Sequence, residues 1–312
     1  MSTIVAGQVA VMFLLIGIGI VCSKTGLFTE EATGPAVNLL LLVVTPAIII
    51  GRFLRPAAPG GLRLVLISGA VVVGITLWAV LVAVLLVRRR EGTNYSIERV
   101  VTAAANSGFM GIPLITAALG QEAMIYAAVY VALFQVFNWT YFARELGGPN
   151  HKPTLKKLLT NPAIISIAAG FACYALQITL PGLFISALDY LANLNTGLSM
   201  VVMGVFLSNV KLKDLKFDRH AWWALALRLL VVPLTTVLLL KLVGAGNWGA
   251  AAQTPIMADI IGCACPAAVV VILMSKRTGR CDPRYGSALV AASTLLSLIT
   301  LPLVVGFAER IL

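Results

Sequence analysis

Charged residues are scarce in this chain of 312 residues: they make up 11% of it, while hydrophobic residues make up 60%. Soluble domains carry about 25% charged and about 45–50% apolar residues, so this composition excludes an ordinary soluble protein. A transmembrane helix needs about 20 mostly apolar residues, and ten such helices would take up most of the chain. The sequence therefore predicts an all-α polytopic membrane protein with no room for a separate soluble domain.

Histidine is nearly absent, and the five cysteines form no C-x-x-C pair. A chain of this kind offers no clear set of metal ligands and no disulfide framework. The sequence also lacks a G-x-S-x-G elbow, an H-E-x-x-H pair and a P-loop lysine, which mark common hydrolases and ATP-driven proteins. We therefore expect no enzyme activity, no cofactor and no metal centre, and any transport would be secondary rather than ATP-driven.

Ten apolar runs are present, and we predict each of them as a membrane span. A linker at 148–157 separates five spans in residues 1–147 from five in residues 158–312. Because five is odd, two related halves would run in opposite directions through the membrane, as an inverted repeat. The predicted spans are 4–23, 34–54, 62–87, 99–118, 122–143, 160–179, 183–209, 219–243, 250–275 and 284–308.

The net charge of +11 is distributed unevenly between the loops. The loops that follow the odd-numbered spans hold 17 of the 23 lysines and arginines. Since cytoplasmic loops are enriched in Lys and Arg, we predict these loops in the cytoplasm and both termini outside, in the cell inner (plasma) membrane. Topology and contact with membrane lipid explain the basic clusters, so no nucleic-acid partner is expected.

The fourth and ninth spans share one pattern, a polar residue seven positions before a proline. Its two instances run from Asn106 to Pro113 and from Asp259 to Pro266. A proline removes one helical hydrogen bond and clashes with the preceding turn, so we expect both helices to be broken and to cross near their prolines. Interrupted helices in corresponding places of two halves point to a transport site near the middle of the membrane.

Helix breaks create the chemistry for binding an anion. The N–H groups at which a half-helix restarts carry partial positive charge and can hold a negative group, and polar side chains near the breaks can complete the site. The predicted substrate-binding residues are Asn106, Ser107, Gly108, Gln135, Asn138, Arg228, Asp259 and Cys265. The predicted crossover or hinge residues are Gly111, Pro113, Gly262 and Pro266.

Asp259 and Arg228 are the only acidic and basic residues that we place deep within a span. A charge at the centre of a membrane helix costs about 2.5–3.5 kcal/mol on insertion scales, so each needs a partner or a wet cavity. Three interpretations stay open: a structural pair, a substrate or proton site that uses one of them, or misplaced span boundaries. In the second case Asp259 is the candidate proton carrier, and Arg228 is the counter-ion of a carboxylate.

Six segments carry a resemblance that covers essentially the whole chain. They are Asn106 to Pro113, Leu-Leu-Thr-Asn-Pro at 158–162, Gly-Leu-Ser-Met at 197–200, Arg-Leu-Leu-Val-Val-Pro at 228–233, Cys-Pro-Ala-Ala at 265–268 and Ser-Thr-Leu-Leu-Ser at 293–297. In this order and spacing they resemble the auxin efflux carrier family, which includes bacterial malate and malonate permeases.

The resemblance implies two inverted five-helix repeats with broken crossover helices 4 and 9, as in bile-acid-sodium-symporter-like folds. It also implies a core of spans 3–5 and 8–10 that slides against a scaffold of spans 1, 2, 6 and 7, often in a homodimer. By position, Asn106, Gly108, Pro113 and Pro266 would frame the site.

These features favour a secondary transporter, efflux-directed or proton-linked, of small organic anions such as mono- or dicarboxylates, working by elevator-type alternating access. A sodium-coupled organic anion symporter is the alternative among transporters, because Asn106, Gln135 and Asp259 could serve either ion. A membrane receptor or scaffold protein is the alternative of another class. It would need a partner-binding loop or domain, which the short linker does not offer.

Overall fold

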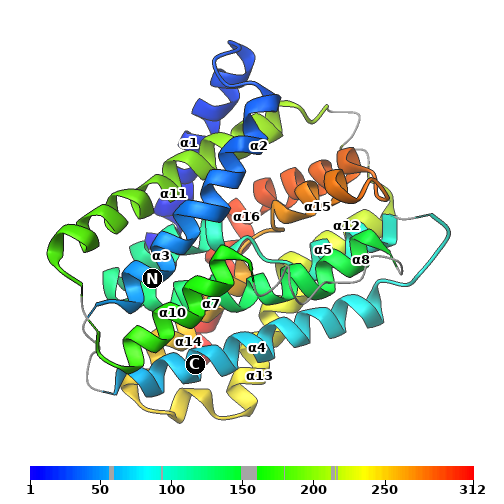
Figure 1. Ribbon diagram of the computed structural model, residues 1–312. Coiled ribbons are helices and arrows are strands. Elements are labelled where there is room, and N and C mark those ends of the chain that lie inside the picture. The colour runs from blue at the N-terminus through cyan, green and yellow to red at the C-terminus, as the bar shows by residue number, and fades with distance from the viewer. Residues whose placement is uncertain (56–59, 93, 149–159, 179, 212–214, 216) are drawn as a thin grey trace.

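The computed structural model describes the chain except residues 56–59, 93, 149–159, 179, 212–214 and 216. The described residues form helices joined by short turns, with no β-strand apart from one isolated bridge. Seven helical segments among them are long and apolar enough to cross a membrane, which confirms an all-helical, multi-pass membrane protein (Figure 1). They are α1 (Ser2–Lys24), α2 (Glu30–Leu39) with η1 (Leu40–Val44) and α3 (Thr45–Phe53), α4 (Gly61–Leu86), η3 (Gln121–Ala123) with α7 (Met124–Phe137), η4 (Asn138–Phe142) and α8 (Ala143–Gly147), α11 (Gly182–Ser208), α12 (Arg219–Ala226) with η6 (Leu227–Val231) and α13 (Val232–Leu242), and α16 (Pro283–Ile311).

Three of the predicted spans fall on shorter helices. One is a single helix, and the other two are interrupted by short non-helical segments at 104–106 and 265–269. The pieces are α10 (Pro162–Ala175), α5 (Asn94–Ala103) followed by η2 (Ser107–Gly111) and α6 (Ile112–Leu119), and α14 (Ala250–Ala264) followed by α15 (Val270–Thr278). A short turn, η7 (Ala245–Asn247), precedes α14.

Wide π-helical turns precede three prolines within the helices. η1 lies before Pro46, η2 before Pro113 and η6 before Pro233, and each proline is the second residue after its wide turn. A proline ring clashes with the carbonyl four residues before it, and the extra residue of a π turn relieves such a clash. The helices therefore continue past these prolines instead of ending at them.

Glycines allow α1 and α11 to cross closely (Figure 1). A Cβ atom on Gly204 of α11 would lie 2.7 Å from the Cα of Gly19, and one on Gly19 would lie 2.9 Å from the Cα of Val201. Small residues at a crossing let two backbones approach, which is the usual way that membrane helices associate. α2 and α3 also pack against α11.

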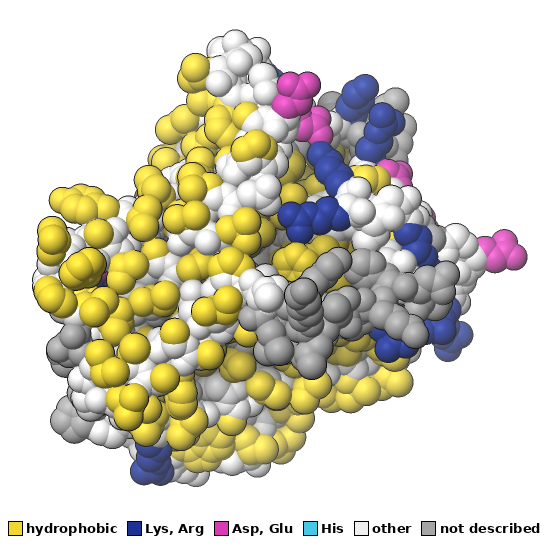
Figure 2. Space-filling view, viewed as in Figure 1, with side chains coloured by type: hydrophobic (Ala, Val, Ile, Leu, Met, Phe, Trp, Pro, Cys, Tyr) yellow, Lys and Arg dark blue, Asp and Glu magenta, His cyan; other side chains and the backbone are white. Residues whose placement is uncertain are grey.

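The surface matches a lipid environment. Large apolar side chains face outward on several helices, among them Leu14 and Leu183, which are 71% and 79% exposed. Figure 2 shows apolar side chains over much of the visible face, while Lys and Arg side chains gather mainly at one end. The predicted linker at 148–157 lies outside the described residues apart from Gly148.

Candidate functional site

The two interrupted helices meet at their breaks. The N–H of Asn106 donates to the carbonyl of Pro266 at 2.8 Å, and the N–H of Ala268 donates to the carbonyl of Ala104 at 2.9 Å. Between these two hydrogen bonds, Ala105 and Ala267 pair as an isolated antiparallel bridge. Lipid cannot form hydrogen bonds with backbone groups that a helix break leaves open. Here each break provides partners for backbone groups of the other.

Two helices begin at this crossing. η2 begins at Ser107 and runs into α6, and α15 begins at Val270. No side-chain hydrogen bond caps either start within the described residues. The first N–H groups of a helix have no partner inside the helix and carry partial positive charge, so the crossing offers donors for an anion.

A small cavity of about 50 Å³ borders both helix starts. Four of the predicted site residues line it: Asn106, Gly108, Gln135 and Asn138. Within the described part of the chain, the Nδ2 of Asn106, the Oγ of Ser107 and the Oδ1 of Asn138 are buried without a hydrogen-bond partner. Buried polar atoms are nearly always paired, so the atoms of Asn106 and Asn138, which line the cavity, are available to a ligand or to water, whereas Ser107 does not line it.

Arg228 binds the ends of α5 and α14 and does not line this cavity. Its Nη1 lies 3.3 Å from the carbonyl oxygens of Thr102 and Ala103, and its Nη2 donates to the carbonyl of Cys263. The residue is 1% exposed, and the ion pairs found among the described residues do not include it. Because helix C-terminal carbonyls carry partial negative charge, one guanidinium compensates two helix ends. The direct pair with Asp259, one of the interpretations left open, is not formed.

Asp259 is fully buried in α14 and faces α4. Its Oδ1 accepts a hydrogen bond from the Oγ of Ser68 at 3.0 Å, and its Oδ2 has no partner among the described residues. Such a carboxyl group can gain or lose a proton without breaking an ion pair, as proton-relay acids in membranes do. Sequence reasoning missed Ser68, because a lone serine in an apolar span carries no distinctive signal.

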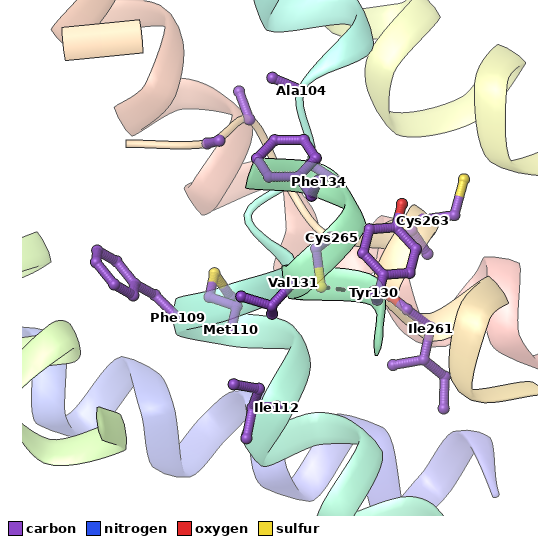
Figure 3. Packing of buried hydrophobic residues seen from close by; sticks show 14 of the residues in the cluster. Ala104, Phe109, Met110, Ile112, Tyr130, Val131, Phe134, Ile261, Cys263 and Cys265 are labelled. Carbon is purple, nitrogen blue, oxygen red and sulfur yellow. Dashed lines mark hydrogen bonds between the residues drawn. The ribbon is translucent and has the colours of Figure 1, made fainter. Parts of the chain in front are cut away.

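Close packing surrounds the crossing (Figure 3). The Sγ of Cys265 lies 3.3 Å from the carbonyl of Ile261, so this predicted site residue points back to α14 and does not line the cavity. A Cβ atom on Gly262 would lie 2.9 Å from the ring of Tyr130, and one on Gly111 would lie 3.5 Å from the Sγ of Cys265. Of the two predicted hinge glycines, Gly262 therefore allows α7 and α14 to pack together, whereas the contact at Gly111 is an ordinary van der Waals contact that does not require a glycine.

The first break lies earlier than the proline pattern predicted. Asn106 is in the break, and Pro113 follows it as the second residue of α6. Pro266 is itself in the second break, whereas Asp259 lies well inside α14. The predicted correspondence of Asn106 with Asp259, and of the two prolines, is therefore wrong. The physical reason is that the wide turn η2 accommodates Pro113 within a continuing helix, whereas Pro266 lies in the segment between α14 and α15.

Two further buried polar residues join separate helices, and the first of them lies at the crossing. The Nδ2 of Asn195 in α11 donates to the carbonyl of Gly108 at 3.0 Å. Glu98 is buried in α5 and accepts hydrogen bonds from Arg90 at 2.8 Å and from the hydroxyl of Tyr285 at 2.7 Å. The predicted fourth span began one residue after Glu98, so this acid was not recognised as an interior residue.

Comparison with known proteins gives two matches. The family model described as "Membrane transport protein" matches residues 4–154 and 151–305 of the chain. The chain is also similar to a protein of Rhizobium meliloti (strain 1021) named "Putative malonate transporter", with 25% identity over 308 residues, which cover 95% of this chain and 93% of that protein. Both matches include the two interrupted helices.

Proposed function

The chain belongs to the membrane transport protein family, and on this basis we propose that it is a secondary transporter of small organic anions such as mono- or dicarboxylates. Membership also confirms the resemblance to the auxin efflux carriers. The observation that carries the proposal is the cavity at the crossing, where two helix starts lie beside unpaired polar atoms of the described residues. The match to a transport family in both halves of the chain favours this function over that of a receptor or scaffold protein.

The donors around the cavity suit a carboxylate. The N–H groups at the starts of η2 and α15 would bind its oxygens, and the Nδ2 of Asn106 would donate a further hydrogen bond. The amide of Asn138, which donates to Gln135 at 3.1 Å, would hold a second polar group. Phe109 and Val131 line the same cavity and would contact the carbon chain. The name of the relative from Rhizobium meliloti supports a dicarboxylate such as malonate.

Binding would require movement of the helices. A cavity of about 50 Å³ has room for one or two water molecules rather than a dicarboxylate, so its walls must separate. We assign α4 to α8 and α12 to α16 to a moving core, and α1 to α3, α10 and α11 to a scaffold. In this elevator-type mechanism the hydrogen bond from Asn195 to Gly108, which joins the two groups, would break.

The wider organisation of the transporter is proposed from the resemblance and the loop charges. Residues 1–147 and 158–312 would form two inverted five-helix repeats that together make ten membrane helices. The protein would act as a homodimer in the plasma membrane, with both termini outside and the basic loops in the cytoplasm. The efflux direction is proposed from the resemblance alone.

Two observations favour a proton over sodium as the coupled ion. In secondary transporters, carbonyls at the C-terminal ends of half-helices often coordinate sodium, but here the guanidinium of Arg228 binds three carbonyls at these ends. Asp259, in contrast, is bound only by the neutral Ser68 among the described residues and keeps one oxygen unpartnered. We therefore place proton coupling at Asp259 and keep the sodium-coupled symporter as the weaker alternative.

Transport in proteoliposomes tests the proposal. The purified protein is expected to exchange labelled malonate, malate or lactate in a saturable manner. Asn106→Ala should lower kcat/KM at least about tenfold, because it removes a buried donor that would bind a charged ligand. Asn193→Ala is the matched control, since Asn193 is an exposed amide of α11. A lack of saturable exchange for every organic anion tested would refute the proposal.

The proton-carrying role is tested with Asp259→Asn. An amide keeps the shape of the carboxyl group but cannot carry the proton, so the dependence of the initial uptake rate on pH should disappear. Uptake is measured from acidic to neutral pH, with the exposed Glu31→Gln as the control acid. If Asp259→Asn retains the pH profile of the wild type, Asp259 has a structural role only.

A further inference from the structure

We propose that the chain has a second carboxylate-binding site, in a cavity away from the crossing, between α3 and α10 on one side and α4, α7 and α14 on the other. The inference rests on the proposed function, because its ligand is again a small organic carboxylate. The cavity has a volume of about 580 Å³, which is typical of sites for small molecules. Its lining includes Arg52, Arg55, Tyr126, Tyr174 and Thr254.

The side chain of Arg52 is the main support for this second site. Its side chain, in the last turn of α3, is 10% exposed, and its guanidinium has no hydrogen bond among the described residues. The ion pair that it forms with Asp189 is long, at 3.8 Å. A guanidinium has five N–H donors, and those of Arg52 reach the cavity, because none of its nitrogens is a fully buried atom among the described residues. A carboxylate in the cavity would offer two acceptors in the bidentate geometry that arginine prefers.

Arg55 takes the short hydrogen bonds of Asp189. Its Nη2 lies 2.8 Å and 2.6 Å from the two carboxylate oxygens, so one carboxylate serves two guanidinium groups and leaves Arg52 the poorer contact. Apart from the two arginines, the lining includes one charged residue, the exposed Glu122. Glu122 is exposed and Asp189 lies outside the lining, so the described wall of the cavity itself carries more positive than negative charge, which favours an anion.

The other lining residues suit an organic anion rather than an inorganic one. Tyr126 and Tyr174 contribute hydroxyl groups, and Leu64 and Ile125 contribute apolar surface. Phe53 packs edge-to-face on Tyr174, with ring centroids 5.8 Å apart, and holds that ring in place. Convergent polar groups beside apolar walls are typical of pockets for small organic molecules, so a carboxylate with a short carbon chain fits this lining.

The position of Arg52 relates the second cavity to the first. Thr45 lines the cavity at the crossing, and Arg52 follows it after seven residues, two helical turns or about 10 Å along α3. Residues two turns apart share one face of a helix, so the same face of α3 borders both cavities. The second site thus lies toward the end of the molecule that carries both termini (Figure 1). It is separated from the crossing by about two turns of α3.

Calorimetric titration of the purified full-length protein with potassium malonate tests the second site. Arg52→Gln is expected to weaken binding at least about tenfold, because it removes a charged bidentate donor. Asp189→Asn should strengthen binding, because it releases both arginines from their shared carboxylate. The control is Arg63→Gln, an exposed arginine that does not line the cavity. Opposite effects of Arg52→Gln and Asp189→Asn cannot both result from misfolding.

The possible outcomes of the titrations distinguish a failure of the second site from a failure of the proposed function. If wild type, Arg52→Gln and Asp189→Asn bind malonate equally while Asn106→Ala binds it weakly, the second site is refuted and the crossing site stands. If potassium phosphate binds as tightly as malonate and depends equally on Arg52, the assignment to organic carboxylates is refuted. If the wild type neither binds nor transports malonate, malate or lactate, the proposed function fails, and this inference fails with it.

Discussion

Replacing Gly19 with alanine is expected to abolish the accumulation of folded protein, whereas replacing Gly17 with alanine should leave it unchanged. The two glycines lie on the same helix, α1. A Cβ atom on Gly17 would meet no atom within 4 Å, but one on Gly19 would lie 2.9 Å from the Cα of Val201 and closer still to its carbonyl oxygen. Backbone atoms cannot turn away as a flexible side chain can, so α1 and α11 would have to separate.

The partner helix offers the same comparison. Gly204→Ala should be as harmful as Gly19→Ala, while Gly197→Ala on α11 should be tolerated, because a Cβ atom on Gly197 would meet no atom within 4 Å. Overpacking typically costs about 1–3 kcal/mol, and we expect at least the upper value here. The yield and size-exclusion profile of all four variants, and the thermal unfolding of those that accumulate, measure the effect. Monodisperse Gly19→Ala and Gly204→Ala proteins with wild-type stability would contradict the close crossing.

Arg228→Met is expected to reduce transport to less than about one-tenth of the wild-type rate and to lower the unfolding temperature. The substitution removes the donors to the carbonyls of Thr102, Ala103 and Cys263. Each buried acceptor left unsatisfied costs about 1–3 kcal/mol. Methionine is long and apolar, so a cavity contributes little to the loss. The two helix ends would repel each other without the charge between them, and the crossing would open.

Two control variants separate the role of this charge from a general effect of substitution. Lys241→Met removes an exposed cation from α13, the helix that continues the segment of Arg228, and should have little effect. Arg228→Lys should be intermediate, because an ammonium group keeps the charge but lacks the planar fork that reaches several acceptors. Wild-type stability and transport in Arg228→Met would show that the crossing does not depend on this side chain.

The positions of the long helices could be predicted because lipid requires continuous apolar runs. The predicted spans 4–23 and 183–209 correspond to α1 and α11 within a few residues, since both the bilayer thickness and helical hydrogen bonding limit where a span can end. Prediction was poorer where tertiary contacts decide whether a residue lies inside a helix. Glu98 lies inside α5 because Arg90 and Tyr285 pair with it, and its pairing with Tyr285 joins residues far apart in the sequence.

The candidate site could be predicted only in part. Asn106, Gln135 and Asn138 stand out as polar residues in apolar spans, and they do line one cavity. The partners of Arg228 could not be predicted, because they are backbone carbonyls, which every residue has. The place of the first break was also missed. Proline is the visible signal of a break, but a wide turn can absorb it, as η2 does before Pro113.

The shared hydrogen bonds of the two breaks have a consequence for synthesis. The segment 104–106 leaves the ribosome about 160 residues before Pro266 and Ala268, which pair with it. At about 5–20 residues per second this interval lasts roughly 10–30 s. Until then the fourth span must remain a continuous helix or find polar partners in water or in the insertion machinery, because lipid offers none. The crossing can therefore form only after most of the chain has been made, and the first half alone cannot hold its shape.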